Sequence, residues 1–362
     1  MFTELSVRAM RRNLKIRPEF FGGIIFDPEL RVTAYVDKDF MRRLGYNDFP
    51  DLDHLSAPEV VHVEVTKRCP LNCKHCYVNA GFGEELSLKQ FKELIDILAD
   101  MNVFQIAFGG GEPFYRDDFL EIARYAYDRG IIPNVTTNGI VIKTDKLDVF
   151  GQINVSLDGA DRETYLRVRG CDTFYEALNA IKMLAESYNV GINVVVTRQN
   201  FDRLHEIFRL AKELEVSEVM LIRVKPVGRC KNVYGDLKLT REQLNRFDET
   251  VRSLLSYDVL LRVDCAFMPF LTPDDNILIG MQGCDCGISS LAIKSDGTVT
   301  PCSFLNYNLG YYRDLREIWN GMDDFRKYEV DDCRNCPKYY ICRGGCRVFA
   351  KDLFGKDSEC LH

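Results

Sequence analysis

Long apolar runs are missing from this sequence of 362 residues. None approaches the roughly 18 residues that a helix needs to cross a membrane, and the segment from Met1 to Leu14 lacks the apolar stretch of a secretory signal. Blocks of like charge are also missing, because the net charge of -7 is spread along the chain, and this argues against nucleic acid as a partner. We find neither internal repeats nor low-complexity segments. We therefore expect a cytoplasmic protein that binds neither membranes nor nucleic acid.

Cysteine, by contrast, is abundant, with fourteen residues. Cytosolic thiols are kept reduced, and disulfide frameworks belong mainly to small secreted domains, so metal ligation is the stronger interpretation. Ten of the cysteines fall into two spacing patterns, from Cys69 to Cys76 and from Cys284 to Cys360, and Cys286 is a near neighbour of the second. The isolated cysteines are predicted to be plain core or surface thiols: Cys171, Cys230 and Cys265.

The middle of the chain, residues 59–264, alternates short β-branched runs with amphipathic stretches, which is typical of βα units around a parallel sheet. Six strands are predicted: Val60–Val65, Val103–Phe108, Pro133–Thr137, Ile153–Leu157, Gly191–Thr197 and Val219–Val224. Helices are predicted over residues 87–100, 118–129, 174–187 and 203–214, and capping boxes open the first of these (Ser87 with Gln90) and a further helix (Thr240 with Gln243). Chemistry in such a sheet gathers where the strands end.

The chain exceeds the size at which a single core usually stops growing, so we expect more than one domain. Two further regions flank the middle one. In residues 1–58, Gly23–Phe26 and Arg31–Tyr35 predict a β-hairpin, followed by a short helix near Lys38–Leu44. In residues 265–362, turns, cysteines and aromatic residues replace the alternation of strands and helices. We expect this last region to be a second domain with little core of its own.

The first cysteine pattern is a C-x3-C-x2-C loop, formed by Cys69, Cys73 and Cys76 directly after the first strand. A cubane 4Fe-4S cluster has four irons, so three thiolates leave one iron free for a chelating cosubstrate. A structural zinc site wants four ligands, and His75 is poorly placed to be the fourth because it stands between two of the cysteines. The loop therefore favours an iron-sulfur cluster over zinc.

This loop, with His75 and Tyr77 around its last cysteine, resembles the signature of the radical S-adenosylmethionine (SAM) superfamily. The turn from Gly109 to Pro113 after the second strand resembles the family's GGE motif, whose role is to bind the amino group of SAM. A glycine turn lets the backbone approach a ligand closely, and Glu112 supplies an acceptor for an ammonium. The resemblance covers roughly residues 60 to 260 and implies an α/β fold, a partial (βα)6 barrel of the TIM type.

The same resemblance implies further contacts to SAM. Ser156 and Asp158 follow the fourth strand and match a segment that contacts the ribose and carboxylate of SAM, and Asn138 is a weaker candidate after the third strand. Arg169 matches an arginine that lies near SAM or substrate in related enzymes, although a solvated surface position is an equal alternative. The implied cofactor-contacting residues are His75, Tyr77, Gly110, Gly111, Glu112, Asn138, Ser156, Asp158 and Arg169.

The second cysteine pattern closely resembles the SPASM domain, an extension of certain radical SAM enzymes that carries two auxiliary iron-sulfur clusters; on spacing alone, a zinc ribbon is the alternative. The resemblance implies a nearer cluster on Cys284, Cys302 and Cys346, and a distal cluster on Cys333, Cys336, Cys342 and Cys360. The nearer set is one ligand short. Cys286 is weakly favoured to complete it, Cys265 is another candidate, and an iron left open to substrate is a third possibility.

These resemblances imply an enzyme that takes an electron from a ferredoxin- or flavodoxin-type donor, cleaves SAM reductively to a 5'-deoxyadenosyl radical and oxidises its substrate. We favour a ribosomally made precursor peptide, modified by a thioether or carbon crosslink. The alternatives are a tetrapyrrole or other small molecule, a protein substrate of the kind that sulfatase-maturating enzymes modify, and a zinc-stabilised scaffold without radical chemistry. Asp264 and Asp285 stand close to the expected site in sequence, but each is predicted to be a turn or surface residue.

The N-terminal region is the clue to a peptide. Residues 17–44 faintly resemble part of the hairpin-and-helix element that binds leader peptides, although the segment is shorter than the complete domain. An exposed hairpin edge would accept a peptide as an added strand. A hairpin that caps the barrel mouth is the structural alternative. The substrate, the product bond, the oligomeric state and any general base are left open.

Overall fold

The computed structural model describes residues 14–30, 32–143, 146–272 and 283–361. Residues 1–13 of the predicted N-terminal region therefore lie outside the described residues. Arg31, at the start of the second predicted hairpin strand, and His362 do so as well.

A parallel sheet forms the centre of the fold and contains all six predicted strands, each displaced by at most two residues. The strands are β4 (Val60–Thr66), β5 (Gln105–Gly110), β6 (Ile132–Thr137), β7 (Gln152–Ser156), β8 (Val190–Val196) and β9 (Glu218–Arg223). They pair in sequence order, and β10 (Leu260–Val263) adds a further parallel strand beside β9. The sequence analysis missed β10, which has only four residues.

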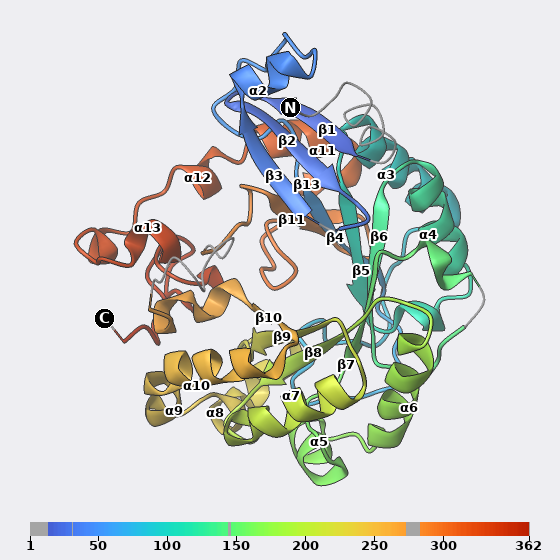
Figure 1. The fold of residues 1–362 in the computed structure, drawn as a ribbon, viewed down its shortest axis with the longest axis vertical. Helices are drawn as coiled ribbons and strands as arrows, with labels where there is room; N and C mark the ends of the chain where they lie inside the picture. Colours follow the sequence, from blue (N-terminus) through green and yellow to red (C-terminus); the bar gives the residue numbers. More distant parts are fainter. Residues whose placement is uncertain (1–13, 31, 144–145, 273–282, 362) are drawn as a thin grey trace.

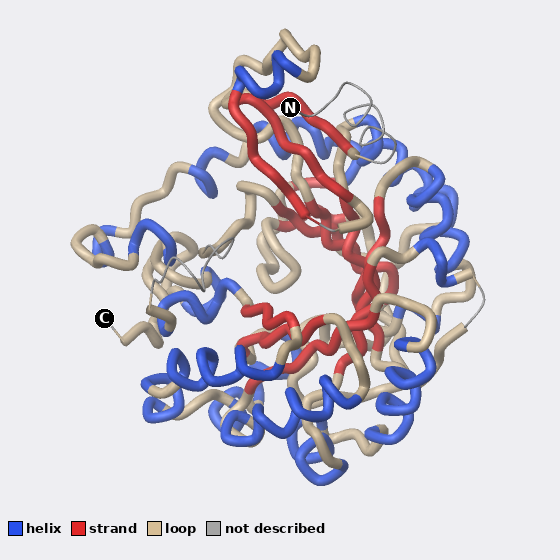
Figure 2. The backbone as a smooth tube through the Cα atoms, viewed as in Figure 1, coloured by secondary structure: helices blue, strands red, loops and turns tan. Residues whose placement is uncertain are grey.

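Helices cover the outer face of this sheet, which curves into an incomplete ring (Figures 1 and 2). They are α3 (Leu88–Asp100), α4 (Phe119–Asp128), α5 (Arg162–Arg169), α6 (Phe174–Ala185), α7 (Leu204–Glu213), α8 (Tyr234–Leu237), α9 (Arg241–Asn245) and α10 (Phe247–Leu254). Both predicted capping boxes are present, at Ser87 with Gln90 and at Thr240 with Gln243. No helix among the described residues is long and apolar enough to span a membrane.

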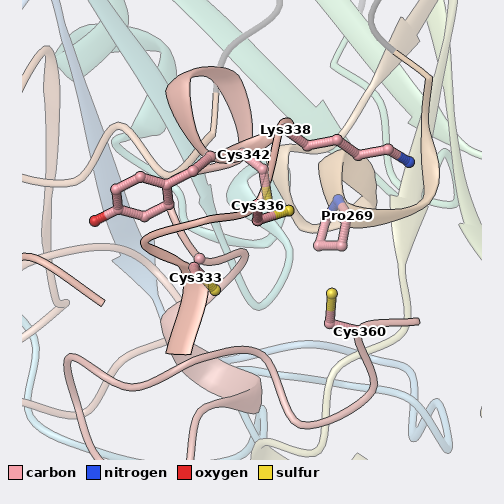
Figure 3. Close-up of a pocket in the computed structure, with 8 residues that line it drawn as sticks. Pro269, Cys333, Cys336, Lys338, Cys342 and Cys360 are labelled. Atoms are coloured by element: carbon pink, nitrogen blue, oxygen red, sulfur yellow. The ribbon is translucent and has the colours of Figure 1, made fainter. Parts of the chain in front are cut away.

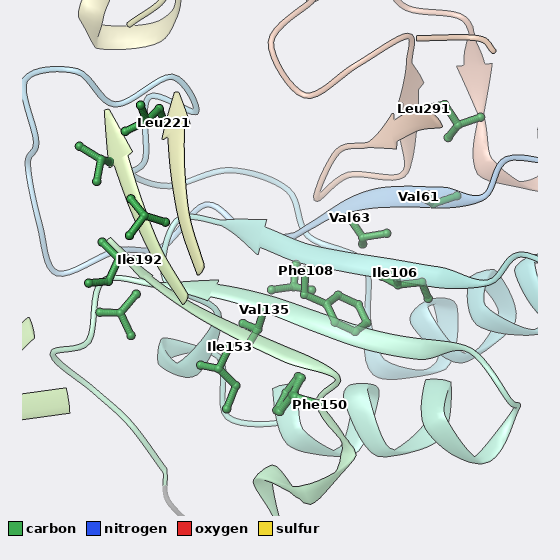
Figure 4. Packing of buried hydrophobic residues seen from close by; sticks show 14 of the residues in the cluster. Val61, Val63, Ile106, Phe108, Val135, Phe150, Ile153, Ile192, Leu221 and Leu291 are labelled. Carbon is green, nitrogen blue, oxygen red and sulfur yellow. The ribbon is translucent and has the colours of Figure 1, made fainter. Parts of the chain in front are cut away.

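The core lies between this sheet and its helices. Figure 4 shows its aliphatic side chains, among them Val63 of β4, Ile106 of β5 and Ile192 of β8. On the helix side, α3 contributes the stripe that its 3.6-residue periodicity predicts, Phe91, Leu94, Ile95 and Leu98, all buried. Along β5 and β6, buried side chains alternate with partly exposed ones, so one face of these strands carries most of the apolar core.

The C-terminal region extends the same sheet rather than folding apart from it. β11 (Ser290–Ile293) pairs in parallel with β4, and β12 (Thr298–Thr300) and β13 (Gly310–Tyr311) continue the sheet antiparallel. Trp319 of α11 (Leu315–Asn320) is fully buried in the main core and donates a hydrogen bond to Leu55 O at 2.7 Å. The C-terminal region therefore shares the core of the barrel instead of forming a core of its own. The sheet also continues beyond residue 264, where the sequence analysis placed a domain boundary.

The remaining C-terminal elements are short: α12 (Asp323–Arg326) and α13 (Tyr339–Cys342), with single helical turns between them. In Figure 1 these segments, coloured orange to red, lie across the open side of the curved sheet.

The N-terminal region is a three-stranded antiparallel sheet, β1 (Lys15–Glu19), β2 (Gly22–Asp27) and β3 (Val32–Asp37), followed by α2 (Lys38–Arg43). The hairpin and the helix are as predicted. The sequence analysis missed β1, which contains a proline.

This small sheet is anchored by Arg17, whose guanidinium donates to Ala57 O at 2.7 Å and Pro58 O at 3.0 Å, and by Phe26, which stacks on Phe104. Those partners stand just before β4 and β5 begin. The alternative of a cap over the barrel mouth is therefore wrong, because the sheet packs at the amino ends of the strands, opposite their carboxyl ends.

Candidate active site and cysteine centres

The three cysteines of the first pattern lie on the loop that follows β4, at the carboxyl end of the sheet. The base of the loop is tied by Thr66, which donates to Glu85 at 2.5 Å, and by Gly81 N, which donates to Lys67 O at 2.8 Å. Cys73 is buried, and Cys69 and Cys76 are partly exposed. Burial raises the pKa of Cys73 to about 11, against the opposing effect of Arg169. Metal binding at this thiol would therefore release a proton.

The GGE turn after β5 is held directly against the base of this loop. Gly111 N donates to Thr66 O at 2.7 Å and Glu112 N donates to Arg68 O at 2.8 Å. Gly110 has a φ of 115°, and a Cβ at Gly111 would lie 2.2 Å from Arg68 O. Only glycine permits this backbone conformation and this close approach, so both glycines are needed to seat the turn.

Glu112 is fully buried between the ends of β5 and β6. Its carboxylate accepts from Thr137 Oγ1 at 2.8 Å, from Asn138 N at 2.7 Å and from Phe114 N at 3.2 Å. Burial raises its pKa to about 7 even though these hydrogen bonds lower it. A carboxylate offers about four acceptor positions, so about one remains for a ligand. The Asn138 amide approaches Cys69 Sγ at 3.7 Å and thereby joins this group to the cysteine loop.

Asp158, after β7, organises a second buried group. Its Oδ2 atom lies 2.9 Å from both His75 Nε2 and Arg169 Nη1, and its Oδ1 atom accepts from Val195 N at 2.7 Å. Burial alone would raise the pKa of Asp158, but the charges of Arg169 and His75 hold it below its usual value. With no exposed surface and both oxygens bonded to protein, this carboxylate is placed to position its neighbours.

Arg169 is buried, so the alternative of a solvated surface residue is wrong. Its guanidinium lies 3.5 Å from Cys73 Sγ, and its carbonyl accepts from Lys74 N at 2.8 Å. Ser156 ends β7 and is partly exposed. Most of the predicted residues therefore converge on one end of the sheet, around the Cys69 loop.

Sequence reasoning missed a clamp on the other side of this loop, formed by η4 (Gly228–Asn232) after β9. Arg229 donates from its side chain to Cys73 O at 3.2 Å and Ala80 O at 2.7 Å. Gly228 has a φ of 59°, and a Cβ there would lie 2.3 Å from Tyr77 O. The signal that would have found the clamp is the Pro-x-Gly turn that follows a predicted strand, in the segment Lys225-Pro-Val-Gly-Arg229.

In the C-terminal region, the structure gathers the nearer predicted set, Cys284, Cys302 and Cys346, together with Cys265 and Cys286. Cys284 Sγ lies 3.2 Å from Cys286 Sγ, and hydrogen bonds from Cys265 and Cys286 lower the pKa of Cys284. Cys265 begins η6 (Cys265–Phe270), so it enters from a different segment. The prediction that Cys265 is an isolated plain thiol is therefore wrong, whereas Cys230 is a core thiol as predicted.

The distal predicted set, Cys333, Cys336, Cys342 and Cys360, lines one small pocket with Pro269 and Lys338 (Figure 3). Arg343, Gly344 and Gly345 have φ values of 53°, 82° and 85°. This left-handed turn reverses the chain between Cys342 and Cys346, which is why two cysteines so close in sequence serve different groups.

A buried ion pair lies between the Cys69 loop and the nearer cysteine group. Lys225, after β9, pairs with Asp264, and its ammonium lies 4.1 Å from the centre of the Phe304 ring, which in turn packs 4.7 Å from Tyr77. Asp264 is buried, and burial raises the pKa of Asp285 to about 6. Asp285 O accepts the turn hydrogen bonds of residues 288–290 and Asp264 O accepts from Phe267 N, so both aspartates are turn residues as predicted, although Asp264 is buried and does not lie at the surface.

The donor sets fit iron-sulfur clusters better than single metal ions. His75 is held by Asp158, which leaves the Cys69 loop without a fourth donor of its own. Tetrahedral zinc needs sulfurs about 3.8 Å apart. Among the described residues, no three cysteine sulfurs lie within 4.8 Å of one another; the compact group found is Asp53, His54 and Asp323, which Lys327 already bridges. Wider spacing is what a multi-iron cluster requires.

Comparison with known proteins agrees with this geometry. The family model described as the radical SAM superfamily matches residues 63–211, and the SPASM model, described as an iron-sulfur cluster-binding domain, matches residues 284–346. The mycofactocin maturase MftC of Mycolicibacterium smegmatis is 32% identical over 331 residues, which cover 85% of this chain and 83% of the maturase. The AdoMet-dependent heme synthase of Oleidesulfovibrio alaskensis is 29% identical, over 82% of this chain and 84% of the synthase.

Among solved structures, Streptococcus suis SuiB bound to its precursor peptide SuiA has the same fold, with a TM-score of 0.78 and 18% identity over 97% of this chain and 99% of that one. The predicted superfamily, the α/β fold and the predicted enzyme class are thus confirmed. The chain therefore belongs to the radical SAM superfamily of enzymes and carries the iron-sulfur cluster-binding SPASM domain.

Proposed function

We propose that this enzyme cleaves SAM at a cluster held by Cys69, Cys73 and Cys76 and oxidatively modifies a ribosomally made peptide. The observation that carries the SAM site is the contact between two backbones, the cysteine loop after β4 and the GGE turn after β5. When bound, the reduced cluster supplies the single electron that splits SAM into methionine and a 5'-deoxyadenosyl radical. A ferredoxin- or flavodoxin-type protein is the proposed donor of that electron.

The chain's own residues hold and orient the reactants. Glu112 offers its remaining acceptor position to the SAM ammonium, and Gly110 and Gly111 let the backbone approach SAM closely. Asp158 keeps His75 and Arg169 in place, so that the Arg169 charge stays beside Cys73. We propose that Asn138 and Ser156, at the ends of β6 and β7, and Tyr77 complete the polar and aromatic contacts to SAM.

In the C-terminal region, we propose two auxiliary clusters: a distal one on Cys333, Cys336, Cys342 and Cys360, and a nearer one on Cys284, Cys302, Cys346 and a fourth thiolate. Each iron of a cubane takes a different thiolate, so ligands must approach from different directions. Cys284 and Cys286 stand two positions apart on one segment, with sulfurs 3.2 Å from each other, whereas Cys265 also contacts Cys284 but enters from a separate segment, η6. This approach from a different direction favours Cys265 as the fourth ligand, whereas the sequence alone favoured Cys286.

Paired substitutions test this ligand. With three cubanes, the reconstituted enzyme should hold about twelve irons. Cys265→Ser is expected to lower the iron content to about eight by loss of the nearer cluster, or to convert that cluster to a three-iron form with a distinct electron paramagnetic resonance (EPR) signal. Cys286→Ser, the matched control, should retain the full content. The reverse pattern would assign Cys286 instead.

The peptide assignment is supported by a free strand edge at the N-terminal sheet. β3 pairs only with β2 among the described strands, and its Val32 and Tyr35 side chains are 55% and 54% exposed. An extended peptide would add to this edge through main-chain hydrogen bonds and pack on those side chains. The maturase relative, and the precursor peptide held by SuiB, point to the same substrate class.

Docking at β3 would act as a tether, because the small sheet lies at the amino ends of the strands, away from the cysteine loop. Tethering raises the effective concentration of the reacting segment without touching the chemistry. Loss of docking should therefore raise KM for the peptide and leave substrate-free formation of 5'-deoxyadenosine unchanged.

A point substitution tests this better than deletion of the region, because deletion would uncover Phe104, which Phe26 now covers. Val32→Asp is expected to weaken binding of a fluorescent candidate precursor peptide about tenfold, by placing a charge where apolar contact is needed. Leu260→Asp is the matched control, since Leu260 is 50% exposed on β10 at an edge of the main sheet. Equal binding by both variants would refute docking at β3.

The heme synthase relatives favour one alternative, a tetrapyrrole substrate. The same assay separates the two. If an iron porphyrin binds and is consumed with 5'-deoxyadenosine formation, while candidate peptides do neither, the substrate is the tetrapyrrole.

A further inference from the structure

Arg347, directly after Cys346, is a buried cation without a hydrogen-bond acceptor. Its side chain is 3% exposed, and Nε, Nη1 and Nη2 all lack a hydrogen-bond partner in the described part of the chain. The guanidinium carbon lies over the Tyr328 ring, 3.3 Å from its centre. An aromatic ring has no lone pair to accept these N–H groups, and a buried charge without acceptors is costly.

Other buried arginines in the described chain are not in this position. Arg17 pairs with Glu19, Arg169 with Asp158, and Arg223 with both Asp357 and Glu359. Because these arginines have carboxylate partners and Arg347 has none among the described residues, we infer that the acceptor for Arg347 is a bound group and not a residue of the chain.

The position of Arg347 identifies that acceptor, because this residue directly follows Cys346, a proposed ligand of the nearer auxiliary cluster, and begins η9 (Arg347–Phe349). The thiols of Cys284, Cys286 and Cys265, gathered at the same site, are near enough to interact with its charge. A cluster held by thiolates carries net negative charge and has sulfur atoms that accept hydrogen bonds. It would therefore supply both the counter-charge and the acceptors that the buried guanidinium lacks.

We propose that Arg347 donates hydrogen bonds to the sulfurs of the nearer auxiliary cluster and raises the reduction potential of that cluster. The inference rests on the proposed cluster site and adds a residue that tunes it. Hydrogen bonds to the sulfurs and nearby charge are established determinants of cluster potential. A fixed positive charge stabilises the reduced cluster, which carries one more negative charge than the oxidised form. Its removal should therefore lower the potential.

The test is a redox titration followed by EPR, without SAM or substrate. A background with Cys69, Cys73 and Cys76 all replaced by alanine removes the signal of the first cluster, and the signal lost in Cys302→Ala identifies the nearer auxiliary cluster. In Arg347→Gln, the ratio of reduced to oxidised nearer cluster at a fixed solution potential should fall about tenfold, a shift of about 59 mV for one electron. The distal cluster serves as the internal reference and should not shift.

Arg343→Gln is the matched control, because Arg343 also lies over the Tyr328 ring but bonds to Arg326 O. It should leave the potential of the nearer cluster unchanged. Arg347→Lys keeps the charge with fewer donors and should shift the potential less than Arg347→Gln. If Arg347→Gln loses the nearer cluster outright, a smaller shift in the same direction in Arg347→Lys still supports the proposal.

Unchanged potentials in both Arg347 variants, with both auxiliary clusters present, would overturn this inference alone. Failure of the proposed clusters is recognised separately, because the background protein with Arg347 intact would then show no auxiliary signal.

Discussion

Replacing Cys69, Cys73 and Cys76 together by alanine is expected to abolish SAM cleavage, lowering the rate of 5'-deoxyadenosine formation with dithionite by at least about a thousandfold. The reason is that reductive cleavage needs an electron delivered next to the sulfonium, and the auxiliary sites cannot replace this one. Their cysteines come from the C-terminal region, whereas the GGE turn that is proposed to hold SAM is hydrogen-bonded to the base of the Cys69 loop.

The measurement is anaerobic incubation with SAM and dithionite, with 5'-deoxyadenosine quantified by chromatography and iron by colorimetry. The triple variant should keep about eight of about twelve irons, which shows that the C-terminal region is intact. Cys230→Ala is the control, because the Cys230 thiol, although it belongs to η4, is buried against Val224 and Leu237, whereas the contacts of η4 to the Cys69 loop come from Gly228 and Arg229. It should retain all iron and the full rate. Residual cleavage by the triple variant within about tenfold of the unsubstituted enzyme would contradict the assignment of the SAM site.

The second large effect is on stability. Asp158→Ala should destabilise the protein by about 3–5 kcal/mol, because it leaves Arg169 buried without its carboxylate partner. It also removes the acceptor for Val195 N and for His75. The loss should appear as a lower urea midpoint of unfolding, followed by far-ultraviolet circular dichroism on anaerobic samples.

Asp161→Ala is the matched control for this substitution. Asp161 stands three residues away and caps α5 by accepting from Thr164 N at 2.9 Å, so its loss should cost only about 1 kcal/mol. In the double variant Asp158→Ala/Arg169→Met, the buried unpaired charge is gone, and part of the stability should return. Equal midpoints for the two single aspartate variants would show that the Asp158 group does not hold this end of the barrel together.

The successes and failures of the sequence analysis have a common physical cause. Long segments with a clear pattern were predicted well: α3 shows its buried stripe and its capping box at Ser87, and the six strands that begin with β4 contain short runs of β-branched and other apolar residues. Short strands were missed, since β10, β11, β12 and β13 have four residues or fewer and carry no readable period. Their pairing is decided by the free edges of a sheet that exists only once the barrel has formed.

The same division holds for the site. A C-x3-C-x2-C loop after a strand, followed by a GGE turn after the next, indicates its chemistry because the parallel sheet brings successive strand ends together. Burial is different. From the sequence, Arg169 is equally compatible with a surface position, and Cys265 is predicted to be an isolated thiol. In the fold, Arg169 lies beside Asp158 and Cys265 lies beside Cys284.

By itself, the sequence determined the superfamily, the parallel sheet and the cysteines available to hold clusters, because spacing and periodicity depend only on residues that are close together in the sequence. Only the tertiary structure decided which thiols share a centre, that Asp158 is bonded to protein on both oxygens, that the N-terminal sheet lies away from the cysteine loop, and that Arg347 is buried without an acceptor. These depend on contacts between segments far apart in the chain, where burial sets the energy of every charge.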